Sequence, residues 1–453
     1  MRVVLSTPVM ADQPWRGRAL HFVGIGGAGM SGLAVVAHAL GASVTGSDRA
    51  AGSAYGGPLR AAGIAPAVGH DAANVPAEAE VVVSSAIPPE NPERAVARER
   101  GQRELHRAEL LGELTRLRPA IAVTGTHGKT TTSSMVVHAL RACGMDPGYL
   151  VGGEVRSTGA NAGWGAGEWL VVEADESDRS LLQLRPAIAA LTNAELDHHT
   201  TYASQRDVDA TFRAFLEQAT QAIVLGPSPG LRTLAAGLVE ATSVAVEPEL
   251  TEGGSRFSLD GVAVELTIPG AHNAANAAVA LTAARLAGAD LATAAESLRD
   301  FQGAGRRFER LGATAAGALV VDDYAHHPTE VAATIAAART LAPSRVIAAF
   351  QPHLFSRTQR QAAEFGAALA TADAVVVLDI YPARERPEDF PGVTGLLVAQ
   401  ASADAAGGKL VAWMPTHALA EAFLRARLRT GDLLLTLGAG DVDALGRALL
   451  APT

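Results

Sequence analysis

A lysine and a threonine hydroxyl follow a glycine turn in the segment AVTGTHGKTTTSSMVVHAL, residues 122–140. The apolar run before Gly125 predicts a strand, and the apolar spacing after Lys129 predicts a helix. A strand, a glycine turn with a lysine, and a helix N-terminus together form a cradle for phosphate. The usual nucleotide-binding signature needs a glycine where this chain has Val123, so the loop is two residues short. The segment either fails as a phosphate site or belongs to a variant of that signature.

Carboxylates follow the next strong apolar run, EWLVV. They are Glu173, Asp175, Glu176 and Asp178. Mg²⁺ prefers hard oxygen ligands, and a hydroxyl from Thr130 would complete such a set next to bound phosphates. The alternative is an acidic surface loop without a ligand. A further run, AIAALTNAELDHH, ends in Asp197 and His198, and a histidine at this place in the same block favours a role near metal or phosphate.

Amide side chains lie at the start of a predicted helix in PGAHNAANAAVAL, residues 269–281. Asn273 and Asn276 are three residues apart and can face the same way. An amide offers both a donor and an acceptor, which suits the edge of a purine. The alternative is that Asn273 caps the helix, and the spacing leaves both interpretations open.

A second glycine cluster opens the chain in HFVGIGGAGMSG. Gly24, Gly26 and Gly29 match G-x-G-x-x-G, and Asp48 ends the next predicted strand. This pattern predicts a pyrophosphate at the turn and a ribose near the carboxylate. It fits a nicotinamide or flavin enzyme, and it equally fits a UDP-sugar; the alternative is a tight turn without a ligand. We expect His70 and the segment from Ser84 to Ile87 at the same edge of the sheet.

Composition limits the class of protein. The chain has 453 residues, 48% of them hydrophobic and 19% charged, which predicts two to four globular domains. The formal net charge of −10 argues against nucleic acid as the main partner. Cys143 is the single cysteine, so we expect no disulfide and a buried thiol on a helix. The sequence contains no signal peptide and no apolar run long enough for a membrane helix, so we expect a cytoplasmic enzyme.

Short β-branched runs alternate with alanine-rich helical segments, which is typical of parallel α/β sheets. We divide the chain into residues 1–118, 119–306 and 307–453. The middle block contains SRFSLDG and VAVELTI, an alternating pair that predicts a hairpin. In the last block we expect one helix from Pro328, another after Arg357, and the polar segment DDYAHHPTE at the end of a strand.

Taken together, the motifs resemble those of the Mur ligase family. The matching segments, in order, are GIGGAGMSG, GTHGKTTT, EADESD, NAELDHHTTY, PGAHNAANA, FQGAGRRFE, DDYAHHPTE, FQPHLFSRT and GAGD. The short phosphate loop is typical of this family. The resemblance implies an α/β protein of three domains: a Rossmann-like UDP-binding domain, a central P-loop-type ATPase domain with a parallel sheet, and a C-terminal Rossmann-like domain.

The resemblance also implies an activity: ATP-dependent joining of L-alanine to the lactyl carboxylate of UDP-N-acetylmuramate, through an acyl phosphate, in peptidoglycan precursor synthesis. Mg²⁺ is the implied cofactor, and Mn²⁺ can substitute. No nucleic acid or membrane partner is implied, and the chain would be a monomer or a homodimer. The alternatives are a ligase that adds an intact tripeptide to the same UDP-sugar, a nicotinamide dehydrogenase and a nucleotide-binding regulator.

Residue roles follow from the same resemblance. The implied catalytic residues are Lys129, Glu173, His198 and His327, with Thr130, Glu173 and His198 as metal ligands. The implied ATP contacts are Gly125, Thr126, His127, Gly128, Lys129, Thr130, Thr131, Asn273, Asn276, Arg306, Arg307 and Asp323. The implied UDP-sugar contacts are Gly24, Gly26, Gly27, Gly29, Asp48, His70, Ser84, Ser85 and Ala86. The implied amino-acid and lid residues are Tyr324, His326 and Arg357.

The chain departs from the family pattern at three positions. Ala271 replaces the usual arginine before the His-Asn pair, Thr200 replaces a carboxylate, and Ala325 replaces a glycine. Other Mur ligases carry a carbamylated lysine at the metal site, and this sequence places no lysine there.

Overall fold

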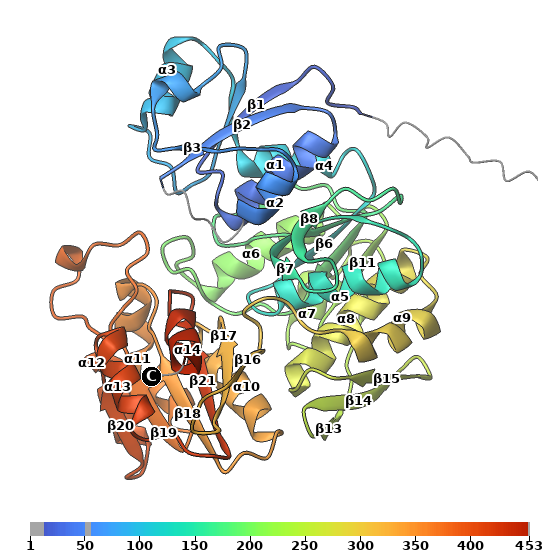
Figure 1. The fold of residues 1–453 in the computed structure, drawn as a ribbon. Coiled ribbons are helices and arrows are strands. Elements are labelled where there is room, and N and C mark those ends of the chain that lie inside the picture. Colours follow the sequence, from blue (N-terminus) through green and yellow to red (C-terminus); the bar gives the residue numbers. More distant parts are fainter. Residues whose placement is uncertain (1–12, 50–55, 452–453) are drawn as a thin grey trace, which may run out of the picture.

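The computed structural model describes residues 13–49 and 56–451. These residues form three α/β units that follow one another along the chain, coloured blue, green to yellow, and orange to red in Figure 1. The expected α/β architecture is confirmed, with sheets that are mostly parallel. Within the described ranges, no helix is long and apolar enough to cross a membrane.

The N-terminal unit has a parallel sheet in the order β3-β2-β1-β4-β5. Its strands are β1 (Ala19–Val23), β2 (Ser43–Asp48), β3 (Ala67–Val68), β4 (Glu80–Val83) and β5 (Glu104–His106). Its helices are α1 (Ala28–Ala39), α2 (Gly56–Ala61), α3 (Pro92–Glu99) and α4 (Arg107–Leu114), with the 3₁₀ turn η1 (Ala72–Asn74). The order reverses beside β1, which is where a doubly wound sheet binds ligands.

The central unit has a sheet in the order β12-β11-β10-β6-β9-β7-β8, and β8 runs antiparallel to β7. The strands are β6 (Ala120–Thr124), β7 (Gly148–Val155), β8 (Ala160–Gly163), β9 (Leu170–Glu173), β10 (Ile188–Leu191), β11 (Ala222–Leu225) and β12 (Ala241–Ser243). The helices are α5 (Lys129–Ala142), α6 (Gln205–Leu216), α7 (Leu231–Leu234), α8 (Ala271–Leu286) and α9 (Leu291–Ser297). Every residue of β6 is buried, as expected for a strand covered on both faces.

A small antiparallel sheet, β13-β14-β15, extends the central unit. Its strands are β13 (Glu249–Thr251), β14 (Gly254–Leu259) and β15 (Val262–Leu266). The β14–β15 pair confirms the predicted hairpin. The third strand, β13, was not predicted.

The C-terminal unit has a sheet in the order β16-β17-β21-β18-β19-β20, in which β16 is antiparallel to β17. The strands are β16 (Glu309–Ala313), β17 (Leu319–Asp323), β18 (Arg345–Phe350), β19 (Ala374–Val377), β20 (Leu410–Trp413) and β21 (Asp432–Leu437). The helices are α10 (Pro328–Arg339), α11 (Phe355–Leu369), α12 (Leu396–Ala405), α13 (His417–Arg425) and α14 (Asp443–Leu450). Helix α11 begins before Arg357, not after it as predicted.

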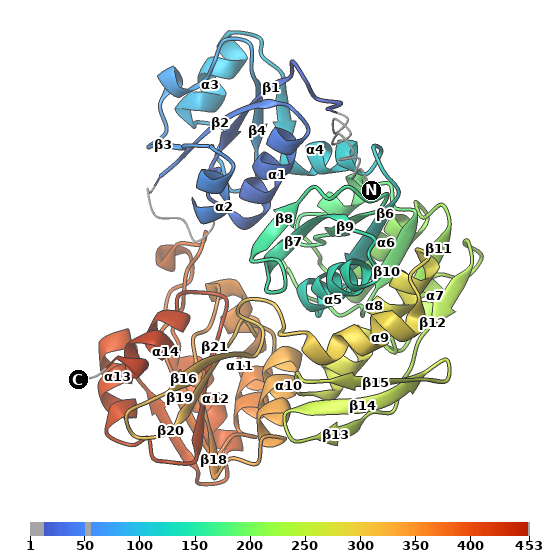
Figure 2. The same ribbon diagram turned by 45° about the vertical axis from the view of Figure 1, so that its right-hand side comes forward.

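The units are joined in two different ways. One apolar core runs from the N-terminal unit into the central one, and α1 packs so closely on β8 that a Cβ on Gly32 would lie 3.0 Å from that of Ala162. The described core clusters of the C-terminal unit consist of its own side chains. Figure 2 shows this unit lying beside α8 and α9 of the central unit. Its contacts with the central unit include the polar pairs Asp197–Arg357 and Glu195–Thr329.

Cys143 departs from the prediction of a buried thiol on a helix. It is the residue that follows α5, and its side chain is partly exposed. Its Sγ lies 3.7 Å from the Asp290 carbonyl oxygen. Cys143 packs at the margin of the central apolar core and is only partly buried.

Candidate active site

The phosphate loop connects β6 to α5. Gly125 and Gly128 have positive φ angles of 136° and 80°, and a Cβ on Gly125 would lie 2.1 Å from Thr192 Oγ1, so only glycine fits this turn. Lys129 is the first residue of α5, and its Nζ donates to the carbonyl oxygens of Gly125 (2.7 Å) and Thr126 (3.0 Å). The lysine thus folds back over its own loop, where it would meet bound phosphate.

Lys129 also pairs with Glu176, whose Oε2 lies 2.9 Å from Nζ. Burial alone would lower the pKa of Lys129, but Glu176 and the neighbouring carboxylates outweigh it and raise that pKa above its usual value. His198 Nε2 lies 3.3 Å from the other oxygen of Glu176. Glu176 therefore joins the phosphate loop to the turn that carries His198.

Glu173 ends β9 beside the phosphate loop. Thr130 Oγ1 donates to its Oε1 (3.1 Å) and the Gly152 N–H donates to its Oε2 (2.7 Å). Burial raises the pKa of Glu173, so a nearby cation would favour its charged form. A hydroxyl and a carboxylate in contact are a donor set that fits Mg²⁺. The predicted ligands Thr130 and Glu173 therefore meet, whereas His198 contacts Glu176 instead.

A cavity of about 240 Å³ lies between the phosphate loop, α8 and the start of α10. Asn273 and Asn276 line it, and both are buried. The helix begins at Ala271 with Gly270 as its N-cap, so the alternative that Asn273 caps α8 is wrong. Its amide instead donates to the Pro269 carbonyl (2.8 Å). Burial lowers the pKa of the neighbouring His272 to about 4, which keeps that ring neutral.

The two predicted arginines point to different places. Arg307 lines the cavity. Arg306 donates to Asp322 Oδ2 (3.0 Å) and to the carbonyl oxygens of Gly438 and Gly440, all within the C-terminal unit. The geometry favours Arg307 and not Arg306 as the phosphate contact.

The other predicted ATP residues lie around the same cavity. His127, Gly128, Thr131 and Asp323 line it, and Thr126 exchanges hydrogen bonds with the backbone of Glu195. Asp323 accepts from the backbone N–H groups of Phe308 and Ala325, and burial raises its pKa to about 6.

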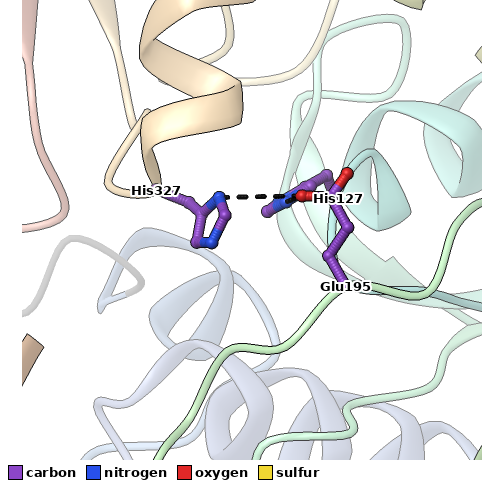
Figure 3. A group of neighbouring side chains, drawn as sticks. All are labelled: His127, Glu195 and His327. Carbon is purple, nitrogen blue, oxygen red and sulfur yellow. Dashed lines mark hydrogen bonds and ion pairs between the residues drawn. The ribbon is translucent and has the colours of Figure 1, made fainter. Parts of the chain in front are cut away.

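Three side chains from two units meet at the edge of this cavity: His127, Glu195 and His327 (Figure 3). The two rings have centroids 4.6 Å apart, and His127 Nε2 lies 3.3 Å from Glu195 Oε2. On its other side, His127 Nδ1 lies 3.2 Å from Glu330 Oε1. Burial would lower the pKa of His127, but the carboxylates of Glu330 and Glu195 outweigh it and raise the pKa to about 9.

His327 is the N-cap of α10. Its Nδ1 accepts from the Thr329 N–H (3.3 Å). The Glu330 carboxylate in turn accepts from the His327 N–H (3.3 Å), which completes a capping box. Its Nε2 lies 3.2 Å from the amide of Gln361. Both ring nitrogens thus have partners, so the geometry does not favour the predicted base role, nor a metal ligand.

A buried ion pair connects the central and C-terminal units. The Arg357 guanidinium donates to Asp197, with Nη2 2.9 Å from Oδ1. Burial would raise the pKa of Asp197, but Arg357 holds it well below its usual range. Arg357 Nη1 lies 3.2 Å from His353 Nδ1, and that ring lies beside His326. Tyr324 packs edge-on to His326, so the predicted amino-acid residues form one group.

In the N-terminal unit, the glycine turn after β1 has the expected shape. Gly24 has a φ of 76°, Gly27 is the N-cap of α1, and Gly29 lies in its first turn. The Asp48 carboxylate accepts a hydrogen bond from the Gly26 N–H through its Oδ2 (2.8 Å). This hydrogen bond stabilises the glycine turn. Ser84, Ser85 and Ala86 follow β4 and His70 follows β3.

Arg107, at the start of α4, joins this turn to the central site. Its Nη2 donates to Asp175 (2.9 Å) and to Asp178 (3.1 Å), and Ser85 Oγ lies 3.4 Å from Asp178 Oδ2. Burial would raise the pKa of Asp175, but Arg107 and Lys129 lower it to about 2. The acidic segment after β9 is therefore a junction of two sites and not a surface loop.

Three residues of the site were not predicted from the sequence: Arg107, Glu195 and Glu330. Glu330 stands three residues after His327, at the spacing of a capping box, and this signal was present in the sequence. Arg107 gave no comparable signal because its partners Asp175 and Asp178 lie in another unit. Glu195 gave none because its partners His127 and Thr329 are distant in the sequence.

Family models match the chain in three consecutive segments. The Mur ligase family catalytic domain matches residues 19–118, the Mur ligase middle domain residues 123–284, and the Mur ligase glutamate ligase domain residues 306–440. A UDP-N-acetylmuramate–L-alanine ligase from Acidithiobacillus ferrooxidans is 44% identical, over 94% of this chain and 96% of that protein. The chain belongs to the Mur ligase family. This finding confirms the resemblance read from its motifs.

Other Mur ligases show the same similarity. A UDP-N-acetylmuramate–L-alanine ligase from Kineococcus radiotolerans is 46% identical, over 95% of each chain. The crystal structure of UDP-N-acetylmuramate–alanine ligase MurC from Thermotoga maritima has a TM-score of 0.81 at 27% identity, covering 95% of this chain and 98% of that one. A murein peptide ligase from Psychrobacter arcticus has a TM-score of 0.72 at 25% identity, covering 96% and 98%.

Proposed function

We propose that this Mur ligase joins L-alanine to the lactyl carboxylate of UDP-N-acetylmuramate and converts ATP to ADP and phosphate. One observation carries the proposal: the acidic segment after β9 is in contact with both sites. Arg107, which lies beside Gly29 of the glycine turn, donates to this segment, and Lys129 of the phosphate loop pairs with Glu176 in it. A sugar nucleotide at the first site and ATP at the second could therefore bring a carboxylate and a γ-phosphoryl group together. The relatives that match nearly the whole chain are named for this activity, and their names give the two substrates of the proposal.

The chemistry proceeds in two steps. The lactyl carboxylate oxygen attacks the γ-phosphorus and ADP leaves, which gives an acyl phosphate. The alanine nitrogen then attacks the acyl carbon, phosphate leaves, and the nitrogen loses a proton. Lys129 and Arg307 would neutralise charge on the transferred group and hold it in line. Burial of the site would keep water from the acyl phosphate.

Thr130 and Glu173 would hold Mg²⁺, and His198 would serve a second ion. A cation held by these residues would supply positive charge that offsets the negative charge of the nucleotide phosphates. The donor atoms support this assignment. The Thr130 hydroxyl lies 3.1 Å from the Glu173 carboxylate, and burial raises the pKa of Glu173. His198 would have to leave Glu176 to take that role, since the two lie 3.3 Å apart.

We assign ATP to the cavity lined by Asn273, Asn276 and Arg307, with its phosphates at Lys129. L-Alanine would bind at the group formed by Tyr324, His326 and Arg357. His326 Nδ1 lies 2.9 Å from the Tyr324 carbonyl oxygen and therefore donates to it, which leaves Nε2 as the ring's acceptor. Burial lowers its pKa to about 4, so the ring is neutral. His326 is therefore better placed than His327 to accept a hydrogen bond from the amine, but a ring with so low a pKa is a weak base.

We keep the division into residues 1–118, 119–306 and 307–453, with UDP-sugar binding in the first unit. A ligase that adds a tripeptide to the same sugar nucleotide would share this fold. The murein peptide ligase has a TM-score of 0.72, which is lower than the 0.81 of the Thermotoga maritima alanine ligase. A nicotinamide dehydrogenase would leave Lys129 and Glu173 without a role.

One assay tests the proposal. Phosphate release is measured with ATP, Mg²⁺ and UDP-N-acetylmuramate, and with either L-alanine or L-alanyl-γ-D-glutamyl-meso-diaminopimelate as the amine. We expect release that requires the sugar nucleotide and L-alanine. Release with the tripeptide alone would identify the recycling activity, and release without any UDP-sugar would overturn both.

A further inference from the structure

A fully buried carboxylate, Glu93, lies under the N-terminal site and takes no part in the steps proposed above. It is the second residue of α3 and is 0% exposed. Its Oε1 accepts from Asn74 Nδ2 (2.8 Å) and from the Asp71 N–H (3.2 Å). Its Oε2 accepts from Ser47 Oγ (2.6 Å) and lies 3.4 Å from His21 Nε2. These contacts connect α3 to β1, β2 and the segment after β3.

Glu93 is ionised at neutral pH. Burial alone would raise its pKa, but the hydrogen bonds from His21, Ser47 and Asn74 lower it to about 2. An ionised carboxylate can only accept hydrogen bonds. The single proton of the Ser47 hydroxyl must therefore point at Glu93.

This orientation determines which nitrogen of His70 carries a proton. Ser47 Oγ lies 2.9 Å from His70 Nδ1. Since the Ser47 proton is directed to Glu93, its oxygen is the acceptor toward His70, and Nδ1 must donate. In a neutral imidazole the other nitrogen, Nε2, then carries the lone pair. The buried carboxylate thus acts on His70 through Ser47, and its Oε2 also lies 3.7 Å from His70 Nδ1, which favours a proton on that same nitrogen.

The strand order indicates what His70 faces. The sheet runs β3-β2-β1, with the glycine turn after β1, Asp48 at the end of β2 and His70 just after β3. In a sheet of this kind the diphosphate lies at the glycine turn and the ribose at the end of the second strand. The base of a bound nucleotide would then extend toward the end of β3. There a neutral His70 offers an acceptor.

We propose that Glu93, acting through Ser47, holds His70 with its proton on Nδ1, so that Nε2 accepts a hydrogen bond from the imide N–H of uracil. Glu93 and Ser47 are positioning residues, and His70 is the group that selects the base. Cytosine has an acceptor at the same ring position, so its approach would set two acceptors against each other. The inference rests on the proposed binding of a UDP-sugar at this site.

The first experiment reads the tautomer directly in the full chain. Long-range ¹H–¹⁵N spectra of ¹⁵N-labelled protein distinguish protonated from unprotonated ring nitrogens, and the His70→Asn variant identifies the His70 signals. We expect a protonated Nδ1 and an unprotonated Nε2, with and without UDP. A proton on Nε2, either alone or together with one on Nδ1, would overturn the proposal. The tautomer itself is read in the wild-type chain, and His70→Asn serves only to identify the signals.

The second experiment measures base selection by calorimetry with UDP and CDP. We expect the wild-type chain to bind UDP more tightly than CDP. Ser47→Ala should weaken UDP binding by roughly tenfold, the effect of one hydrogen bond, with little change for CDP. Glu93→Gln should do the same, because its amide can donate to Ser47 and reverse the direction of the relay.

Thr45→Val is the matched control. Thr45 Oγ1 lies 2.8 Å from His21 Nδ1 in the same network, but it does not contact His70. We expect this variant to keep the preference for UDP. Equal losses for UDP and CDP in Ser47→Ala would reduce the network to a structural role and overturn the proposal; if Glu93→Gln does not fold, Ser47→Ala decides. Phosphate release is assayed separately, so UDP selection without ligation would count against the proposed function alone.

Discussion

Lys129 is the residue on which the phosphate site depends most directly. Its ammonium group contacts two loop carbonyls and Glu176, all within the central unit. Replacing it by alanine removes the charge that would stabilise the transferred phosphoryl group, so we expect Lys129→Ala to lower phosphate release by roughly 10²-fold or more. UDP-sugar affinity should stay within about twofold of wild type, because substitutions at distant sites that share no partners act nearly independently. Phosphate release and calorimetry measure the two effects.

The other lysine of the chain provides the control for this prediction. Lys409 donates to the carbonyl oxygens of Ala370 and Ala372 in the C-terminal unit. Lys409→Ala should leave phosphate release unchanged. A large loss of UDP-sugar affinity in Lys129→Ala would contradict the assignment of the two nucleotides to separate units.

Glu173 allows a test of the metal assignment. Glu173→Gln keeps the shape of the side chain and one oxygen but removes the charge that a hard cation requires. We expect turnover to fall and the Mg²⁺ concentration at half-maximal rate to rise by about tenfold, the equivalent of one lost charged contact. Glu168→Gln, at an exposed position just before β9, should change neither. An unaltered Mg²⁺ dependence in Glu173→Gln would remove Glu173 from the metal site.

The residue scale also shows how far the sequence predicts a site. Thr130 and Glu173 could be placed together because parallel strands end at one edge of a sheet, and they do meet. Arg107 could not be placed, because its contact with Asp175 exists only once two units have packed. Arg306 and Arg307 are neighbours in sequence, and only the folded backbone, with a φ of 56° at Arg306, separates their directions.

At the scale of elements, the N-terminus of α10 separates two interpretations of His327. As an N-cap, His327 accepts from the Thr329 N–H, and asparagine can do the same. We expect His327→Asn to keep a near-normal kcat and His327→Ala to cost about 1 kcal/mol of stability through loss of the cap. Steady-state kinetics and thermal unfolding of both variants measure this. If kcat falls by the same large factor in both, the ring itself takes part in the reaction.

The predicted elements follow the strength of their patterns. Strands such as β6 and β18 are continuous apolar runs that only a covered sheet accommodates, and the run before Gly125 predicted β6. The strand β8 has the sequence ANAG, which carries no strand signal of its own. It forms because it pairs with β7 and because Asn161 donates to the Ala28 carbonyl in the N-terminal unit. Such a strand is a product of packing and cannot be predicted locally.

At the scale of the whole molecule, the units differ in how firmly they are joined. The N-terminal and central units share an apolar core, whereas the C-terminal unit meets the central one through polar pairs such as Asp197–Arg357 and Thr329–Glu195. Polar contacts of this kind rearrange at lower cost than a shared core. This arrangement suits a unit that closes over bound ATP and sugar nucleotide and opens to release products.

The contact around His127 makes the joint between these two units sensitive to pH. His127 faces Glu195 of its own unit and, from α10, Glu330 and the neutral ring of His327; Arg307 and His326 lie beside Glu330. The pKa of His127 in the folded protein is about 9, above its ordinary value of about 6.5. A group with a raised pKa stabilises the folded contact fully below its unfolded pKa and loses that effect as pH rises through the folded value. We therefore expect the contact to weaken between about pH 6.5 and pH 9.

Small-angle scattering of the nucleotide-free protein measures this effect. The radius of gyration should increase as pH rises across the window, because the C-terminal unit loses a charged contact with the phosphate loop. His127→Gln keeps a hydrogen-bonding side chain without the titrating charge, so its radius should be larger at pH 6.5 and nearly constant up to pH 9. A wild-type radius that stays constant over the same range, or a His127→Gln curve that still follows pH, would show that another group controls the joint.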